Sequence, residues 1–384
     1  MSTISGVTIG LEAEHMSSRI RELRERLNLN QDELGERVGV TRQTIAAWEK
    51  GQREASVTQL TKVAQVLKVP VELLLRQEGR TDTEQVNLLF RADQPGSLTD
   101  TDLAVLSRRA ADYADIERKV GHLPLLPESR PMDGYWEEAV EQVAQETRDW
   151  LGVEGAPLGD VFDLLERRGL KIIRARLPDR VWGFSAFTDD WGGIIFVNTH
   201  SEGKPIPTER QYFTAMHELG HLIFHRRVYG GPNEPTQKRD PREDAANHFA
   251  RAVLLPADAL KQELRQYKGR WLPEPLLVNI KLKYGVSVGT TLFRAGQLKI
   301  IPEKLMHQQF GRFKKLYPAT HGEPDRISIP EPVGCTRLEL LVFAALVQEK
   351  ISTNRAAEVL DRPLVRIRDE LLAWLPEEEG GVQA

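Results

Sequence analysis

The sequence predicts a mainly helical protein of the α+β class, and three observations support this. Apolar residues recur at helical spacing in most segments, with long helical patterns at 208–226 and 240–255. Strand-like runs are short and confined to residues 170–198, where "WGFSAF" and "GGIIFVN" flank the turn "TDDWG". The 384 residues are enough for two or three domains. We therefore expect several helical units and one small β-sheet.

Each element has a local reason in the sequence. Gly169 ends a helix that begins near Asp160, because glycine readily adopts the left-handed conformation that stops helices. Asp240 and Pro241 begin the helix over 240–255, one as its cap and the other at its first position. The expected helices cover most of residues 15–75, 100–120, 136–150, 160–168, 208–226, 240–255 and 338–374; the expected strands cover 170–177, 182–187 and 193–198.

These elements divide the chain into five segments, and the polar stretch "EGRTDTEQ" marks the first main boundary. Within the last segment, residues 351–374 show a helix, a turn and a second helix. That pattern fits a second winged-helix-like unit, a docking module or a helical cap. The expected segments are a flexible tail at 1–14, a helical bundle at 15–78, a helical linker region at 79–134, a sheet-containing domain at 135–300, and a helical C-terminal domain of unknown role at 301–384.

Composition indicates a folded protein of the cytoplasm. Hydrophobic residues make up 40% of the chain and charged residues of both signs 28%. Cys335 is the single cysteine, so no intramolecular disulfide can form. We find neither a signal peptide nor an apolar run long enough for a membrane helix. The net charge of −4 predicts that any attraction to nucleic acid is local.

The first motif predicts a helix-turn-helix. Asn30 can cap a helix that carries Glu33 at its third position, which is a capping-box arrangement. Gly39 then allows a tight turn, and Thr41 can cap the next helix. The apolar residues at helical spacing, which we expect to form the core, are Leu34, Val38, Ile45, Trp48, Leu60, Val63, Ala64 and Leu67.

The second helix of this motif begins Thr41-Arg42-Gln43-Thr44, and such a helix presents its first residues to the major groove. Arg42 can bind guanine, and Gln43 can bind adenine, in bidentate fashion. Gln31 and Lys50 lie where phosphate contacts are expected. Residues 15–75 hold ten Lys and Arg against eight Asp and Glu, a small positive bias. The alternative is a helical bundle whose arginine and glutamine side chains are merely solvated.

This segment resembles the XRE/Cro-repressor helix-turn-helix family. The resemblance implies a five-helix bundle that binds a specific double-stranded DNA operator, usually as a homodimer, although it leaves the operator sequence open. The frame Q-x-x-L-x-x-x-x-G-V-x-x-x-x-I-x-x-W-E-x-G is matched at Gln31, Leu34, Gly39, Val40, Ile45, Trp48, Glu49 and Gly51.

The second motif, "MHELGHLIFH", predicts a metal-binding helix. His217 and His221 are one helical turn apart, so both imidazoles can reach one Zn²⁺. Glu218 is turned away from them by about 100° and can take a proton from a water molecule on the metal. His225 lies about 12 Å from His217 along a straight helix, so we expect it to pack beside the site. We expect Gly220 to allow a neighbouring element to come close.

A third ligand is expected from "DPREDAANHFARAVLLPAD". Small residues near Glu243 would let this helix approach the histidine helix closely and direct Glu243 at the metal. Spacing alone leaves three alternatives open: Glu243 completes a capping box with Asp240, or Asp244 or His248 is the ligand instead.

Residues 158–256 resemble the ImmA/IrrE metallopeptidase family, through R-x-x-F-T-x-x-H-E-L-G-H at 210–221 and E-x-x-A-N-x-F-A at 243–250. The resemblance implies a helical zincin-like domain with a small sheet, His217, His221 and Glu243 as zinc ligands, and Glu218 as the catalytic base. Manganese or iron would also suit these ligands.

The ImmA/IrrE resemblance also implies a substrate class, because such peptidases cleave repressor-like DNA-binding proteins and relieve repression. Cleavage here would be of a partner repressor, or of the chain itself within residues 78–132. Two alternatives remain open: a transcription regulator whose zinc domain senses or scaffolds without cutting, and an antitoxin or phage-type immunity factor.

Overall fold

The structure is a computed structural model that describes twelve stretches of the chain, and the predicted tail at 1–14 lies outside them. The described residues form two compact units: one contains those up to residue 67 and Thr99–Val105, the other Leu98 and those from Leu106 onward. The described residues are 20–21, 24, 29–53, 55–67, 98–122, 127–132, 134–179, 181–188, 191–226, 240–320, 322–324 and 328–374.

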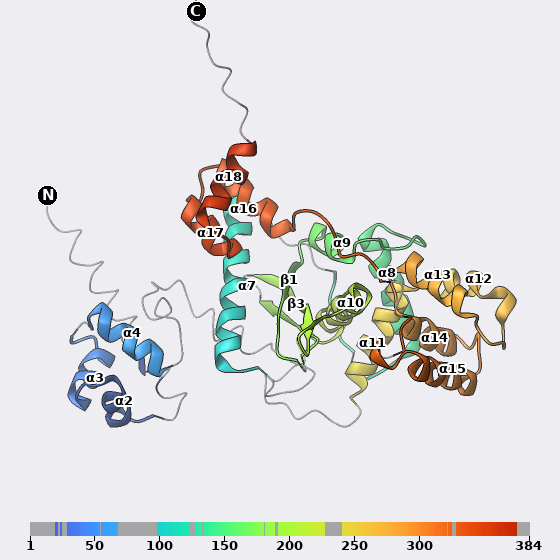
Figure 1. Ribbon diagram of the computed structural model, residues 1–384, viewed down its shortest axis with the longest axis horizontal. Helices are drawn as coiled ribbons and strands as arrows, with labels where there is room; N and C mark the ends of the chain where they lie inside the picture. The colour runs from blue at the N-terminus through green and yellow to red at the C-terminus, as the bar shows by residue number, and fades with distance from the viewer. Residues whose placement is uncertain are drawn as a thin grey trace, which may run out of the picture. The chain divides into compact units, whose positions relative to one another are not determined.

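The first unit contains the predicted helix-turn-helix (Figure 1), built from α2 (Gln31–Val38), α3 (Arg42–Glu49) and α4 (Val57–Val66). Both bonds of the predicted capping box are present between Asn30 and Glu33, and Gly39 ends α2 with a φ of 80°. All eight predicted core residues are buried, together with Ile20. The predicted helix-turn-helix is therefore confirmed, and three complete helices of the expected bundle lie within the described residues.

The predicted small sheet is also confirmed. It follows α9 (Val161–Arg167) and contains β1 (Lys171–Ala175), β2 (Gly183–Thr188) and β3 (Gly192–Asn198). The strand order is β1-β3-β2, with β1 parallel and β2 antiparallel to β3. Every residue of β3 is buried, as expected for a central strand covered on both faces. A two-stranded ribbon, β4 (His200–Ser201) with β5 (Lys204–Pro205), follows.

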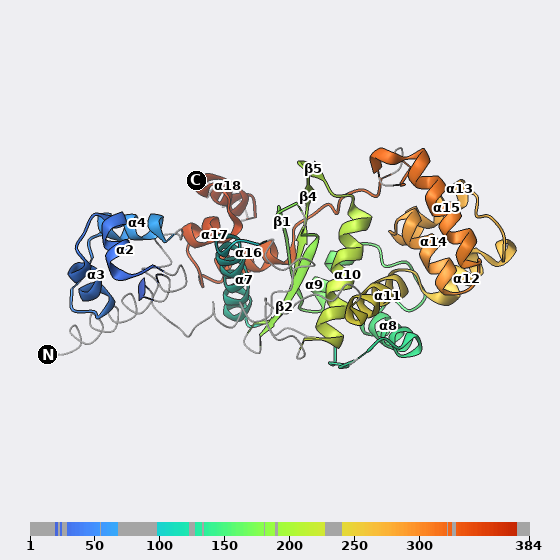
Figure 2. The same cartoon turned by 90° about the horizontal axis from the view of Figure 1, so that it is seen from below.

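Helices cover the sheet in layers. Figure 2 shows α10 (Thr208–Phe224) alongside the strands, then α11 (Pro241–Leu254) and α8 (Glu137–Leu151) beyond it. α12 (Ala257–Glu263), α13 (Glu274–Tyr284) and α14 (Val288–Gln297) extend the same core. α15 (Glu303–Leu316) joins it through Met306 and Phe313, so the core continues past residue 300.

A second group of helices lies at the other side of the sheet (Figure 1). It contains α7 (Asp100–Val120), α16 (Arg337–Val347), α17 (Thr353–Leu360) and α18 (Leu364–Trp374). From residue 106 onward, α7 is bound to the C-terminal helices by ion pairs, among them Arg355 to Asp112 at 2.6 Å and Arg337 to Glu117. The expected helix of the linker region therefore packs against the C-terminal segment, a pairing that local sequence patterns do not reveal.

The predicted helix, turn and helix at 351–374 are present as α17 and α18, with Asp361 at a φ of 52° between them. Within the described part of the chain, no helix is both long and apolar enough to cross a membrane.

Candidate metal centre and nucleic-acid interface

Helix α10 places His217 and His221 on one face, with their Nε2 atoms 2.9 Å apart. The helix continues unbroken through Gly220 to Phe224. A Cβ at Gly220 would lie 3.3 Å from the Cα of Ala246 and 3.1 Å from the ring of Phe249, both on α11. The structure thus confirms the expected role of Gly220: it allows α11 to pack closely against α10.

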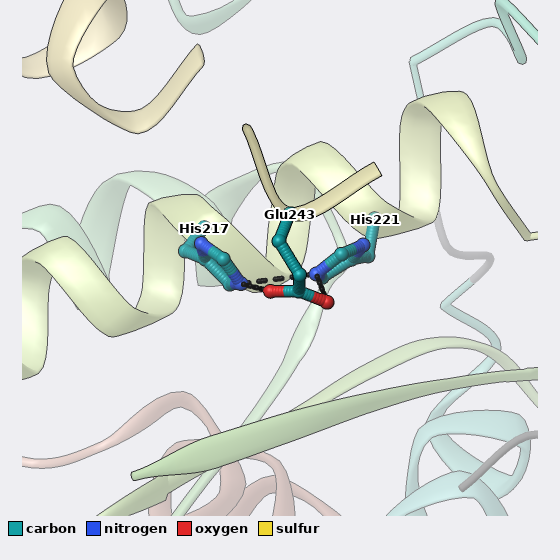
Figure 3. A group of neighbouring side chains, drawn as sticks. All are labelled: His217, His221 and Glu243. Atoms are coloured by element: carbon teal, nitrogen blue, oxygen red, sulfur yellow. Dashed lines mark hydrogen bonds and ion pairs between the residues drawn. The ribbon is translucent and has the colours of Figure 1, made fainter. Parts of the chain in front are cut away.

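Glu243, in the first turn of α11, completes a three-residue cluster (Figure 3). Its carboxylate oxygens lie 3.2 Å from Nε2 of His217 and 3.5 Å from Nε2 of His221. The N-cap Asp240 instead accepts a hydrogen bond from the backbone N–H of Arg242. The capping-box alternative for Glu243 is therefore not what the structure shows.

The two substitute ligands lie elsewhere. Asp244 is exposed on α11. His248 is buried and holds the hydroxyl of Tyr135 at 2.9 Å from Nδ1 and a carboxylate oxygen of Glu141 at 2.6 Å from Nε2. Both imidazole nitrogens of His248 are thus engaged in a separate network that links α8 to α11.

The cluster stabilises Glu243 as a carboxylate. Burial raises the pKa of this carboxyl, but hydrogen bonds from His217 and His221 outweigh burial and hold the pKa well below its usual range. His225, which we expected to pack beside the site, has Nδ1 at 3.1 Å from Nδ1 of His221. Burial lowers the pKa of His225 to about 3, so this imidazole is neutral and can accept a hydrogen bond from His221.

Glu218 is buried and has a partner on the sheet. The hydroxyl of Ser185, on β2, donates to Oε2 of Glu218 at 2.9 Å. Gly183 allows this approach, because a Cβ there would lie 2.4 Å from a methyl group of Thr214 and 2.7 Å from the backbone oxygen of Phe196. The sequence analysis did not identify Ser185 as part of the site. The one local feature that could have indicated it is a polar residue within a largely apolar strand.

The three side chains suit a divalent metal ion. Two imidazole nitrogens and one carboxylate oxygen lie within 4.8 Å of one another, and this set is typical of catalytic zinc with an open fourth position. A neutral His225 behind His221 also fits, because it would orient the ring so that Nε2 faces the cluster. The residues present therefore fit the metal that the motif implies.

On the first unit, most predicted DNA contacts are accessible. Arg42 is 65% exposed, and Thr41, Gln43 and Lys50 are exposed as well. Thr41 caps α3 and its hydroxyl lies 2.9 Å from that of Thr44, which is half-buried.

Gln31 is half-buried and has a partner within the unit. Its side-chain amide donates to Glu49 at 2.8 Å, and Glu49 also binds the buried Arg24 at 2.6 Å. This network gives Gln31 and Glu49, two residues of the family frame, a structural role. The expected phosphate contact of Gln31 stays a prediction.

Two protein families match the chain. Residues 20–74 match the helix-turn-helix family, and residues 165–295 match the IrrE N-terminal-like domain, which is a peptidase family. The second match contains all of β1, β2, β3, α10 and α11, and so the whole candidate metal centre.

Several of the similar proteins match a short stretch of this chain. A transcriptional regulator of Sinorhizobium medicae is 42% identical over 15% of this chain and 41% of its own length, so the chain spans about two fifths of that relative. The regulator YgzD of Bacillus subtilis is 42% identical over 15% of this chain and 86% of its own. A c2 repressor in complex with a synthetic operator is 32% identical over 16% of this chain and 96% of its own, with a TM-score of 0.16. The chain therefore belongs to the XRE-type helix-turn-helix family through residues 20–74 and carries an IrrE N-terminal-like domain at residues 165–295.

Proposed function

We propose that this protein is a cytoplasmic DNA-binding transcription regulator and a zinc-dependent endopeptidase that cleaves a repressor-type protein. The observation that carries the proposal is the convergence of His217, His221 and Glu243 from two helices, with Glu218 beside them on α10. Zinc held there would polarise the scissile carbonyl and acidify a water molecule. Manganese or iron would suit the same ligands.

The chain's own residues supply the proton transfer and its geometry. Glu218 accepts a proton from the attacking water on a carboxylate oxygen and donates it to the leaving amine. Ser185 fixes Oε2 of Glu218 through its hydroxyl. His225 fixes the ring of His221 from the opposite nitrogen. These two contacts keep the base and one ligand oriented before a substrate arrives.

The sheet offers a binding edge beside these residues. Among the described strands, β2 pairs with β3 alone, so an extended peptide would add at its other edge. Ser185 lies in the middle of β2 and contacts Glu218. A peptide added along β2 would therefore pass the proposed base.

Within the described part of the 78–132 segment, α7 is a poor substrate candidate, because Tyr113, Ile116 and Glu117 on it are buried. Peptidases that add a substrate strand to a sheet edge need an extended segment, and a packed helix does not provide one. The helix-turn-helix similarity to transcriptional regulators supports DNA as the second partner.

The test replaces Glu218 with glutamine in the zinc-loaded full chain. Glu218→Gln keeps the three ligands, so we expect unchanged zinc content and unchanged operator binding. New protein N-termini, which the wild type should generate in cells, should disappear with the variant. If Glu218→Gln keeps metal and every regulatory effect of the wild type, the zinc domain senses or scaffolds and the peptidase proposal is wrong.

A further inference from the structure

Strand β2 runs alongside α10, and four contacts in order establish this. The guanidinium of Arg210 lies 3.6 Å from the ring centre of Trp182, just before β2. Next along the strand, Gly183 packs against Thr214, and Ser185 donates a hydrogen bond to Glu218. Beyond the strand's middle, the guanidinium of Arg226 lies 5.1 Å from the ring centre of Phe187. Residue numbers therefore increase in the same direction on both elements.

The two arginines stand on opposite sides of the proposed reacting centre. Phe187 lies two residues, about 7 Å, beyond Ser185 along an extended strand, and Trp182 lies three residues, about 10 Å, before it. A peptide paired with the edge of β2 that no described strand occupies would have the same spacing. Its side chains two to three residues from the scissile bond would thus reach Arg226 on one side and Arg210 on the other.

Both arginines lie near an aromatic ring, with the guanidinium of Arg210 against Trp182 and that of Arg226 near Phe187. A guanidinium forms charge-assisted hydrogen bonds with carboxylates through its several N–H donors. Arg210 is exposed, and its neighbour Glu209 is buried and bound to Lys281 at 2.5 Å. Arg226 is half-buried and donates one N–H to the backbone oxygen of Pro127 at 3.3 Å, which fixes it further.

We propose that Arg210 and Arg226 are specificity-determining residues that select peptides with acidic side chains on both sides of the scissile bond. The inference rests on the proposed peptidase function and adds a substrate class to it. The two guanidinium groups would form charge-assisted hydrogen bonds with aspartate or glutamate side chains. They would therefore bind these acids more tightly than asparagine or glutamine.

The first experiment digests a proteome-derived peptide library with the zinc-loaded full chain and maps the cut sites by mass spectrometry. Aspartate and glutamate should be enriched at least threefold, two or three residues from the cut on each side. Arg226→Glu should change the preference from acidic residues to lysine and arginine on one side of the cut only. Arg210→Glu should make the same change on the other side only. Arg265→Glu, an exposed arginine on η1 (Arg265–Tyr267), is the matched control and should cut as the wild type does.

A measurement of peptide binding tests the inference independently of cleavage, in case the arginine variants cut poorly. Glu218→Gln, loaded with zinc, should bind an acidic library peptide at least ten times more tightly than the same peptide with its acids converted to amides, and adding Arg226→Gln should reduce that ratio. Wild-type cutting without an acidic preference, or equal binding of acid and amide peptides, would overturn the inference alone. No cutting of any peptide by the wild type would overturn the proposed function with it.

Discussion

At the residue scale, the contact between Ser185 and Glu218 has the clearest consequence. Its hydroxyl hydrogen bond to a carboxylate contributes about 1.5–3 kcal/mol in typical proteins, and about 1.4 kcal/mol corresponds to a tenfold change in rate. We expect Ser185→Ala to lower kcat about tenfold with little change in KM, measured on a peptide that the wild type cuts. Zinc content should stay unchanged, because Ser185 contacts the base and none of the three proposed ligands. Ser185→Thr should restore part of the rate; equal kcat for Ser185→Ala and wild type would contradict the positioning role.

At the element scale, Glu166 of α9 joins three elements and makes stability depend on pH. Burial raises the pKa of Glu166 to about 7 from 4.5, although the backbone N–H of Arg337 and the hydroxyl of Tyr113 donate to it. Between these values the folded chain holds a proton that the unfolded chain has released, so stability falls as pH rises from 4.5 to 7 and then levels off. Glu166→Gln should remove on the order of 1–3 kcal/mol of this decline, measured from urea midpoints across that range. Parallel curves for variant and wild type would show that Glu166 is not the titrating group.

At the scale of the whole molecule, the two units should respond separately to metal removal. The proposed ligands join α10 to α11 inside the second unit, whereas the helix-turn-helix core lies in the first. A metal that binds only the folded form stabilises it by about 2.7 kcal/mol at a hundred times its Kd. A chelator should therefore lower the melting temperature of the second unit by about 5–10 °C, leaving the first unit's transition and operator binding unchanged, as calorimetry and DNA titration would show. His217→Ala should melt early and be insensitive to chelator; a chelator effect on this variant would place the metal elsewhere.

The helix-turn-helix and the histidine helix were predictable because their evidence is local. Capping by Asn30 and Thr41, the left-handed turn at Gly39, and the one-turn spacing of His217 and His221 all follow from backbone geometry within a few residues.

Contacts between segments distant in the chain were decided by the tertiary structure alone. Spacing left Glu243 with a capping alternative, and only the packing of α11 against α10 at Gly220 turns its carboxylate to the histidines. The hydrogen bond from Ser185 to Glu218 joins residues 33 positions apart, and the ion pair of Arg337 on α16 with Glu117 on α7 joins residues 220 positions apart. Sequence periodicity records which face of an element is buried, but it carries no information on which partner buries that face.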